Sequence, residues 1–168
     1  SDNKKELATP FTDPVATLYD STLKPFYHGV ASGDPLTDRV ILWTRVTPEE
    51  SVSSIAVQWE VAEDSNFSSI YKSDTLSTTP ARDYTVKVDV DGLQPGKTYY
   101  YRFSALGKTS LVGRTKTTSV SGLDSLKLAI VSCSNWEWGY FNAYDKIADR
   151  TDEDAVVHLG DYIYEYGT

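Results

Sequence analysis

The sequence has 168 residues, of which 40% are hydrophobic and 24% charged, and its formal net charge is −8. This length accommodates one large domain, or a small domain with part of another, and the composition excludes a disordered chain. No apolar run approaches the roughly 20 residues that a membrane-spanning helix needs, and the single cysteine, Cys133, excludes an internal disulfide.

The negative charge is concentrated toward the C-terminus. Residues 1–120 contain 13 Lys and Arg against 15 Asp and Glu, whereas residues 121–168 contain 3 against 9. An acidic segment repels nucleic-acid backbones and attracts cations, so we expect no nucleic-acid partner. The charge is compatible with metal binding, although by itself it favours a solvated helix face and loop.

The first part of the chain is predicted to be an all-β domain. Residues 1–25 are polar, contain three prolines and show no sustained period, which indicates an N-terminal arm. From 26 to 118, hydrophobic residues alternate at period two between closely spaced turn residues, which is typical of an immunoglobulin-like sandwich. Seven antiparallel strands are predicted, near 26–32, 40–46, 55–62, 67–74, 84–90, 97–105 and 110–117.

Aromatic residues refine this prediction to a fibronectin type III-like sandwich. In LQPGKTYYYRF (93–103), the spacing of Leu93, Pro95 and Tyr99 is that of a turn into a strand with a tyrosine whose hydroxyl bonds back to the backbone. Trp59 is the expected core tryptophan. We expect most tyrosines and tryptophans here to belong to the core and rim rather than to a ligand-binding strip.

After a linker at 119–125, the pattern changes to that of an α/β domain. LKLAIVSC (126–133) and DAVVHLG (154–160) are nearly continuous apolar runs, which suit strands buried on both faces of a parallel sheet. Between them, the apolar spacing in residues 139–150 predicts a helix. The segment 126–168 is therefore predicted to contain a right-handed β-α-β unit.

Three side chains with metal-binding chemistry are predicted to meet at one edge of this sheet. Cys133 ends the first strand and Asp161 follows the second, and ligands gather at the carboxyl ends of parallel strands. Gly160 permits a sharp turn, and Tyr164 lies close enough to reach the same point. A thiolate, a carboxylate and a phenolate together suit a trivalent transition metal, although each alone is more often a structural residue.

Three motifs in order resemble the alkaline phosphatase D family. FYHGVASGDP (26–35) followed by RVILWTRV (39–46) is similar to the start of that family's amino-terminal domain. SCSNWEWGYFNAY (132–144) and HLGDYIYEYG (158–167) resemble its first and second catalytic segments. The resemblance implies that residues 126–168 are the start of an α/β metallophosphoesterase domain.

The resemblance also implies an activity and a ligand set. It implies an exported enzyme, periplasmic or extracellular, that hydrolyses phosphate mono- or diesters. Cys133 and Tyr164 match the family's ligands to iron(III), and Asp161 matches the aspartate that bridges iron and calcium. No catalytic residue beyond these metal ligands is expected in this chain. We expect His158 to support the site or the core rather than to bind metal, and we assign no role to Asn135.

The chain departs from the family in length, because the segments that supply the remaining metal ligands are not present in it. We therefore expect only part of a site, and little activity from these residues alone. We expect the edges of the parallel sheet to be covered by the missing catalytic portion, as another chain. A competing interpretation is a binding module, with the sandwich recognising carbohydrate or protein at a cell surface. A third is a sandwich that only braces the catalytic domain.

Overall fold

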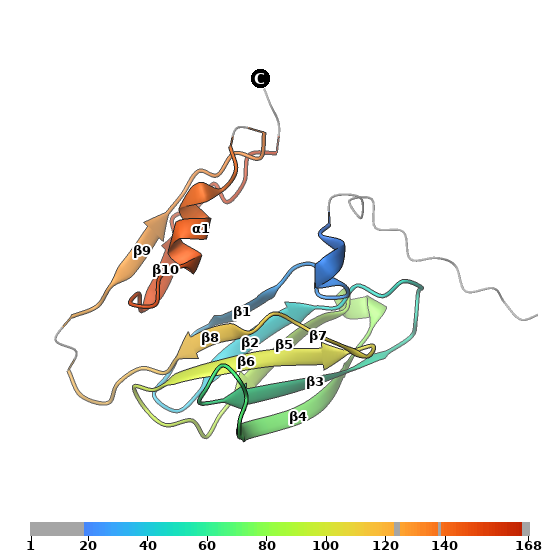
Figure 1. The fold of residues 1–168 in the computed structure, drawn as a ribbon, viewed down its shortest axis with the longest axis horizontal. Coiled ribbons are helices and arrows are strands. Elements are labelled where there is room, and N and C mark those ends of the chain that lie inside the picture. The colour runs from blue at the N-terminus through green and yellow to red at the C-terminus, as the bar shows by residue number, and fades with distance from the viewer. Residues whose placement is uncertain (1–18, 123–124, 138, 166–168) are drawn as a thin grey trace, which may run out of the picture. The chain divides into compact units, whose positions relative to one another are not determined.

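The computed structural model describes residues 19–122, 125–137 and 139–165. It divides the chain into two compact units, Ser1–Val120 and Ser121–Thr168 (Figure 1). Most of the predicted N-terminal arm, residues 1–18, and the middle of the predicted linker lie outside the described residues. No helix in the described part of the chain is both long enough and apolar enough to cross a lipid bilayer.

The first unit is a β-sandwich of two antiparallel sheets. One sheet has the order β1-β2-β5, and the other has the order β4-β3-β6 with β7 and β8 both paired to β6. Among the described residues of this unit, the single-turn 3-10 helices Ser21–Leu23 and Pro80–Arg82 flank its strands. The strands are β1 (Val30–Gly33), β2 (Val40–Arg45), β3 (Ile55–Ala62), β4 (Ile70–Thr78), β5 (Thr85–Val90), β6 (Thr98–Ala105), β7 (Lys108–Thr109) and β8 (Gly113–Lys116).

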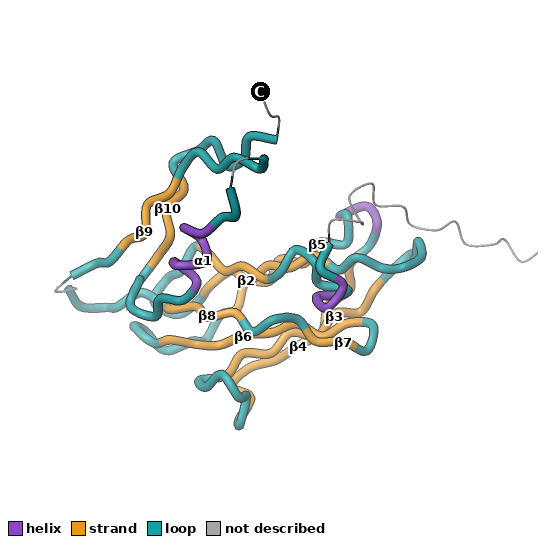
Figure 2. The backbone as a smooth tube through the Cα atoms, turned by 45° about the horizontal axis from the view of Figure 1, so that its top comes forward, coloured by secondary structure: helices purple, strands orange, loops and turns teal. Residues whose placement is uncertain are grey.

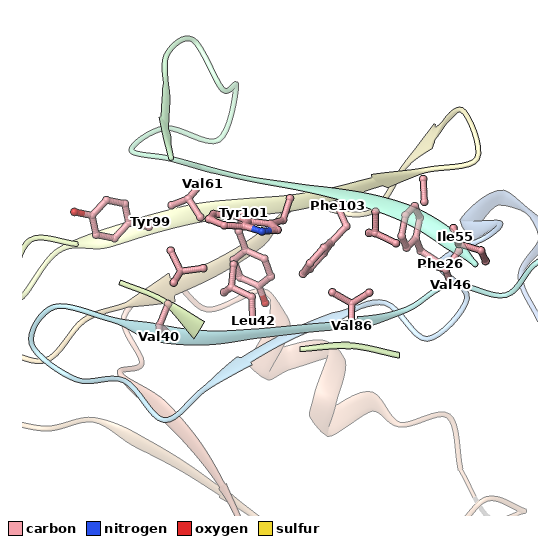
Figure 3. Close-up of a cluster of buried hydrophobic side chains, with 14 of the residues drawn as sticks. Phe26, Val40, Leu42, Val46, Ile55, Val61, Val86, Tyr99, Tyr101 and Phe103 are labelled. Atoms are coloured by element: carbon pink, nitrogen blue, oxygen red, sulfur yellow. The ribbon is translucent and has the colours of Figure 1, made fainter. Parts of the chain in front are cut away.

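The core of the sandwich follows from the alternation in the sequence. In β3, every second residue from Ile55 to Val61 is buried, and the residues between them face outward except near the end of the strand. Leu42 of β2 and Phe103 of β6 are fully buried from the two sheets (Figure 3). Each such side chain contributes about 1.5–3 kcal/mol by leaving water, so the interleaved apolar faces hold the two sheets together.

Both aromatic predictions for the sandwich are confirmed. The hydroxyl of Tyr99 accepts a hydrogen bond from the backbone amide of Gln94 over 2.9 Å. Trp59 is 5% exposed and belongs to the core cluster. The predicted hydrogen bond of the Tyr99 hydroxyl therefore connects the loop before β6 to that strand.

Strand boundaries differ from the predictions where side chains stabilise turns. The carboxylate of Asp64 accepts hydrogen bonds from the backbone amides of Asn66 and Ser68, and Phe67 has a positive φ of 55°. This turn delays β4 to Ile70. The predicted strand at 110–117 is the shorter β8, preceded by the two-residue β7. At the start of the sandwich, the chain turns at Gly29, and β1 begins one residue later.

The second unit contains a strand, a helix and a strand: β9 (Leu128–Val131), α1 (Asn142–Ala148) and β10 (Ala155–His158). The strands are parallel, with Leu128 opposite Ala155 and Val131 opposite His158, and they run side by side in Figure 2. The helix is shorter than the predicted 139–150, because Phe141 adopts a left-handed conformation with φ 54° and provides no side-chain cap.

The prediction that both parallel strands are buried is wrong for this chain. Ile130 of β9 is 61% exposed and Val156 of β10 is 54% exposed. None of the described residues from 121 to 165 is buried. The apolar runs are those of central strands, but a sheet of two strands and one short helix provides too little surface to cover both faces.

Candidate metal centre

The backbone pairing of β9 and β10 continues into the loops that follow them. The amide of Cys133 donates to the carbonyl of Gly160 over 3.3 Å, and the amide of Ser134 donates to the carbonyl of Asp161 over 3.2 Å. The amide of Tyr164 then donates back to the carbonyl of Ser134 over 2.7 Å. The two loops therefore lie side by side beyond the strand ends, and this pairing places the predicted site residues next to one another.

Two of the predicted site residues have unusual backbone conformations. Cys133 has φ 60° and Asp161 has φ 49°, both in the left-handed region. This conformation costs an ordinary residue about 1–2 kcal/mol. Gly160, with φ 107°, precedes Asp161 and occupies a conformation that side chains disfavour. Left-handed residues that persist at the ends of two adjacent strands are typical of functional sites.

Cys133 and Asp161 are in contact through their side chains. The Cys133 thiol donates to a carboxylate oxygen of Asp161, with Sγ and Oδ2 separated by 3.7 Å. Both residues are exposed. The two parallel strands therefore bring together a thiol and a carboxylate that are 28 residues apart in the sequence.

Tyr164 joins this pair through its phenol group. A hydrogen bond to Asp161 raises the pKa of Tyr164 well above its usual value, and partial desolvation and a hydrogen bond to Cys133 act in the same direction. The structure thus brings all three predicted site residues together at the carboxyl edge of the sheet.

The three residues form a small set of anionic donors. Among the described residues, no three His, Cys, Asp or Glu side chains gather into a metal-binding group, so this candidate depends on the tyrosine. When deprotonated, the three groups offer one sulfur and two kinds of oxygen ligand. That combination fits a trivalent transition metal, with a carboxylate oxygen left for a second, harder cation.

His158 lies near Cys133, Asp161 and Tyr164, but its ring nitrogens form hydrogen bonds with other residues. Its Nε2 is 3.1 Å from the hydroxyl of Tyr144, and its Nδ1 accepts the backbone amide of Gly160 over 3.2 Å. The Asn135 side-chain oxygen accepts the amide of Glu137 over 2.9 Å. Both side chains therefore serve local hydrogen bonds in this structure.

Two further residues near the site were not predicted from the sequence. Tyr144 lies within the helix predicted for residues 139–150, and its hydroxyl bonds to the hydroxyl of Ser134 as well as to His158. The helical period locates Tyr144 on one face but carries no information on the partner of its hydroxyl. Ser134 directly follows Cys133, and its side chain is half-buried.

A surface pocket of about 560 Å³ lies beside Cys133. It is lined by residues 130–135 at the end of β9 and by residues 139–144, which lead into α1. Pockets of this size accommodate small organic ligands. The thiol of Cys133 and the side chains of Ser134 and Asn142 provide polar groups around it.

Comparison with known proteins identifies the family of this chain. Residues 14–119 match the model of the PhoD-like phosphatase N-terminal domain, and residues 128–168 match the PhoD-like phosphatase model. Alkaline phosphatase D of Bacillus subtilis (strain 168) is 44% identical over 151 residues, which cover 85% of this chain and 26% of that protein.

A solved structure described as the structure of PhoD matches the fold. It superimposes with a TM-score of 0.79 at 43% identity, and the match covers 88% of this chain and 30% of that one. The chain therefore spans about a quarter to a third of the length of these relatives. The two family matches together cover most of the sequence, and the chain belongs to the PhoD-like phosphatase family.

Proposed function

We propose that the protein to which these residues belong is a metal-dependent hydrolase of phosphate mono- or diesters. The observation that carries this proposal is the convergence of Cys133, Asp161 and Tyr164 at the carboxyl edge of β9 and β10. Family membership supports the same activity. The substrate is a phosphate ester, and the pocket beside Cys133 is large enough for its phosphoryl end.

The proposed metals are iron(III) and calcium. Cys133 and Tyr164 would hold the iron, and Asp161 would hold both cations through its two carboxylate oxygens. Cations bound there would neutralise charge that develops on the phosphoryl oxygens during ester cleavage. The chain's own contribution is to fix the spacing of its three donors and to give up the protons that they share when no metal is bound.

The remaining ligands are proposed to come from polypeptide outside these 168 residues. The exposed apolar residues of β9 and β10 support this, because they are the surface that further strands and helices of a catalytic domain would cover. By the same reasoning, these residues alone are proposed to have little activity. We further propose an exported location. We also propose that the protein has no nucleic-acid partner, because its net charge of −8 would repel a nucleic-acid backbone.

The proposal is tested on the full-length protein with the substitution Asp161→Asn. The wild type is expected to contain iron and calcium and to hydrolyse p-nitrophenyl phosphate or its bis-ester. Asp161→Asn is expected to lose bound metal and activity together, because the amide offers one neutral oxygen in place of two charged ones. Asp145→Asn changes an exposed carboxylate on α1 and serves as the matched control.

Two results would contradict the proposal. An Asp161→Asn variant that keeps both its metal and its activity would remove Asp161 from the site. A folded wild-type protein that takes up no metal and hydrolyses neither ester would instead favour the binding-module interpretation.

A further inference from the structure

We infer that Ser134, Tyr144 and His158 form a clamp that positions the Cys133 loop against the Asp161 loop. This inference rests on the proposed function, because it concerns the two loops that carry the proposed metal ligands. The clamp residues are proposed to act by positioning these loops and not as metal ligands, and Ser134 and Tyr144 also line the pocket beside Cys133. They come from three elements: Ser134 from the loop after β9, Tyr144 from α1, and His158 from the last position of β10.

A continuous series of hydrogen bonds connects the three elements. The amide of Gly160 bonds to His158 Nδ1 over 3.2 Å, and His158 Nε2 lies 3.1 Å from the Tyr144 hydroxyl. The Tyr144 hydroxyl bonds in turn to the Ser134 hydroxyl. Gly160 immediately precedes Asp161 and Ser134 immediately follows Cys133. The series therefore begins and ends next to the two proposed ligands.

The direction of the first two hydrogen bonds follows from the first member of the series, whereas either hydroxyl can be the donor in the bond between Tyr144 and Ser134. A backbone amide only donates, so His158 Nδ1 accepts and carries no proton. The neutral ring then has its hydrogen on Nε2, which donates to the oxygen of Tyr144. With that oxygen serving as acceptor, the Tyr144 proton is available for Ser134, its other bonded partner. Every polar atom in the series is thus used in one consistent arrangement.

The clamp is partly shielded from water. Ser134, Tyr144 and His158 are each half-buried, as is Tyr164, whereas Cys133 and Asp161 are exposed. Hydrogen bonds that are partly shielded from water hold their geometry better than exposed ones. Because none of the described residues of this unit is buried, apolar packing contributes little to fixing these loops, and hydrogen bonds must do more of it.

The backbone of the loops needs such support. Cys133 and Asp161 are held in left-handed conformations, with φ of 60° and 49°, which persist only when surrounding contacts enforce them. Pairing of the loop backbones supplies part of that constraint. The clamp adds a side-chain connection through α1 that is independent of that pairing. It therefore opposes relative sliding of the two loops and would keep the proposed ligands at a fixed spacing.

The test removes single hydroxyl or ring atoms in the full-length protein. Tyr144→Phe deletes the central hydroxyl and keeps the ring. His158→Asn keeps an acceptor near the Nδ1 position but loses the bond to Tyr144, whereas His158→Gln keeps a donor near the Nε2 position. Tyr162→Phe is the matched control, because Tyr162 is 75% exposed and the substitution keeps its ring, which lies 5.0 Å from that of His158.

Two readouts distinguish positioning from general stability. The first is amide hydrogen exchange in peptides covering 128–137 and 159–165, measured on protein stripped of metal with EDTA. Tyr144→Phe and His158→Asn are expected to accelerate exchange in both peptides about fivefold, the factor that corresponds to one hydrogen bond. The second is hydrolysis of p-nitrophenyl phosphate by metal-loaded protein, where kcat is expected to fall about tenfold with KM unchanged.

The outcomes separate this inference from the proposed function. If Tyr144→Phe and His158→Asn exchange no faster than Tyr162→Phe, the clamp is wrong whatever the activities are. Equal acceleration in all peptides, including those of the sandwich, would also overturn it, since that marks global destabilisation. Milder effects for His158→Gln than for His158→Asn would support it. If the wild type hydrolyses no ester, the proposed function fails, and the exchange data alone decide whether the clamp exists.

Discussion

Tyr164, a proposed metal ligand, is uncharged in the metal-free protein. Its phenol donates to Asp161, and the pKa of Tyr164 is raised, so the group keeps its proton at neutral pH. If Tyr164 is a ligand as proposed, it would bind metal as the phenolate and would have to release this proton. The hydrogen bonds that hold the site together without metal would then compete with metal binding.

A pH dependence of metal affinity follows. Because the free phenol has a raised pKa, its proton is released on binding at every pH below that value, and affinity for iron(III) is expected to rise with pH by about tenfold per unit for this proton. Tyr164→Phe should reduce the number of protons released on binding by one. Calorimetric titration of the metal-free, full-length protein in buffers of different ionisation enthalpy counts these protons.

Tyr162→Phe is the control for this measurement, because it removes an exposed hydroxyl two residues away. The same proton count in the Tyr164→Phe variant and the wild type would show that Tyr164 does not bind the metal as phenolate. If Cys133 also binds the metal as proposed, its thiol would release a second proton, so the count in the Tyr164 variant is expected to decrease by one rather than to vanish.

At the scale of elements, one close contact closes the side of the sandwich where β6 and β8 pair. A Cβ built on Gly113 of β8 would lie 2.2 Å from the Tyr101 ring of β6. Tyr101 is 2% exposed, and burial raises the pKa of its hydroxyl to about 12 although a hydrogen bond to Ser32 of β1 opposes that rise. This one side chain therefore links strands of both sheets.

Gly113→Ala is expected to destabilise the protein by about 1–3 kcal/mol, since the buried ring must move to admit a methyl group. Gly33→Ala is the matched control, because a Cβ at Gly33 of β1 meets nothing within 4 Å. Urea unfolding followed by tryptophan fluorescence measures both variants. Equal midpoints for the two would mean that the ring has room to move and that the contact is not rigid.

The sequence predicted the elements that depend on alternation and missed those that depend on side-chain hydrogen bonds. The buried faces of β2 and β3 and the bond of the Tyr99 hydroxyl follow directly from local patterns. The start of β4 did not, because the Asp64 carboxylate forms a turn that periodicity does not register.

The same division applies to the candidate site. Strand ends in parallel order predicted that Cys133 and Asp161 would lie together, and they are in contact. The clamp was not predicted, because its bonds join residues 10 and 14 positions apart whose partners depend on how α1 packs. No local pattern in the sequence encodes that packing.

At the scale of the whole chain, the two units differ in how completely they are folded. The core cluster lies entirely in the first unit, from Phe26 to Ala105. The second unit has none of its described residues buried. A domain without a buried core cannot offset the conformational entropy lost on folding.

Residues 1–120 are therefore expected to fold alone, with a cooperative thermal transition and near-ultraviolet circular dichroism from the buried aromatic side chains. Residues 121–168 alone are expected to show neither. Separate expression of the two segments checks this. Independent, cooperative folding of residues 121–168 would show that β9, α1 and β10 need no covering polypeptide, and would remove the argument for it made from their exposed apolar side chains.

The exposed apolar strands have a consequence for biosynthesis. Domains generally fold as units, and those nearer the N-terminus fold first as the chain leaves the ribosome. The sandwich has its own buried core and can therefore fold before polypeptide that follows β10 is available. Strands β9 and β10 then emerge with side chains such as Ile130 and Val156 still exposed to water. If the proposed catalytic polypeptide covers them only later, they would be a part of the nascent protein that needs protection from aggregation, through a chaperone or rapid further synthesis.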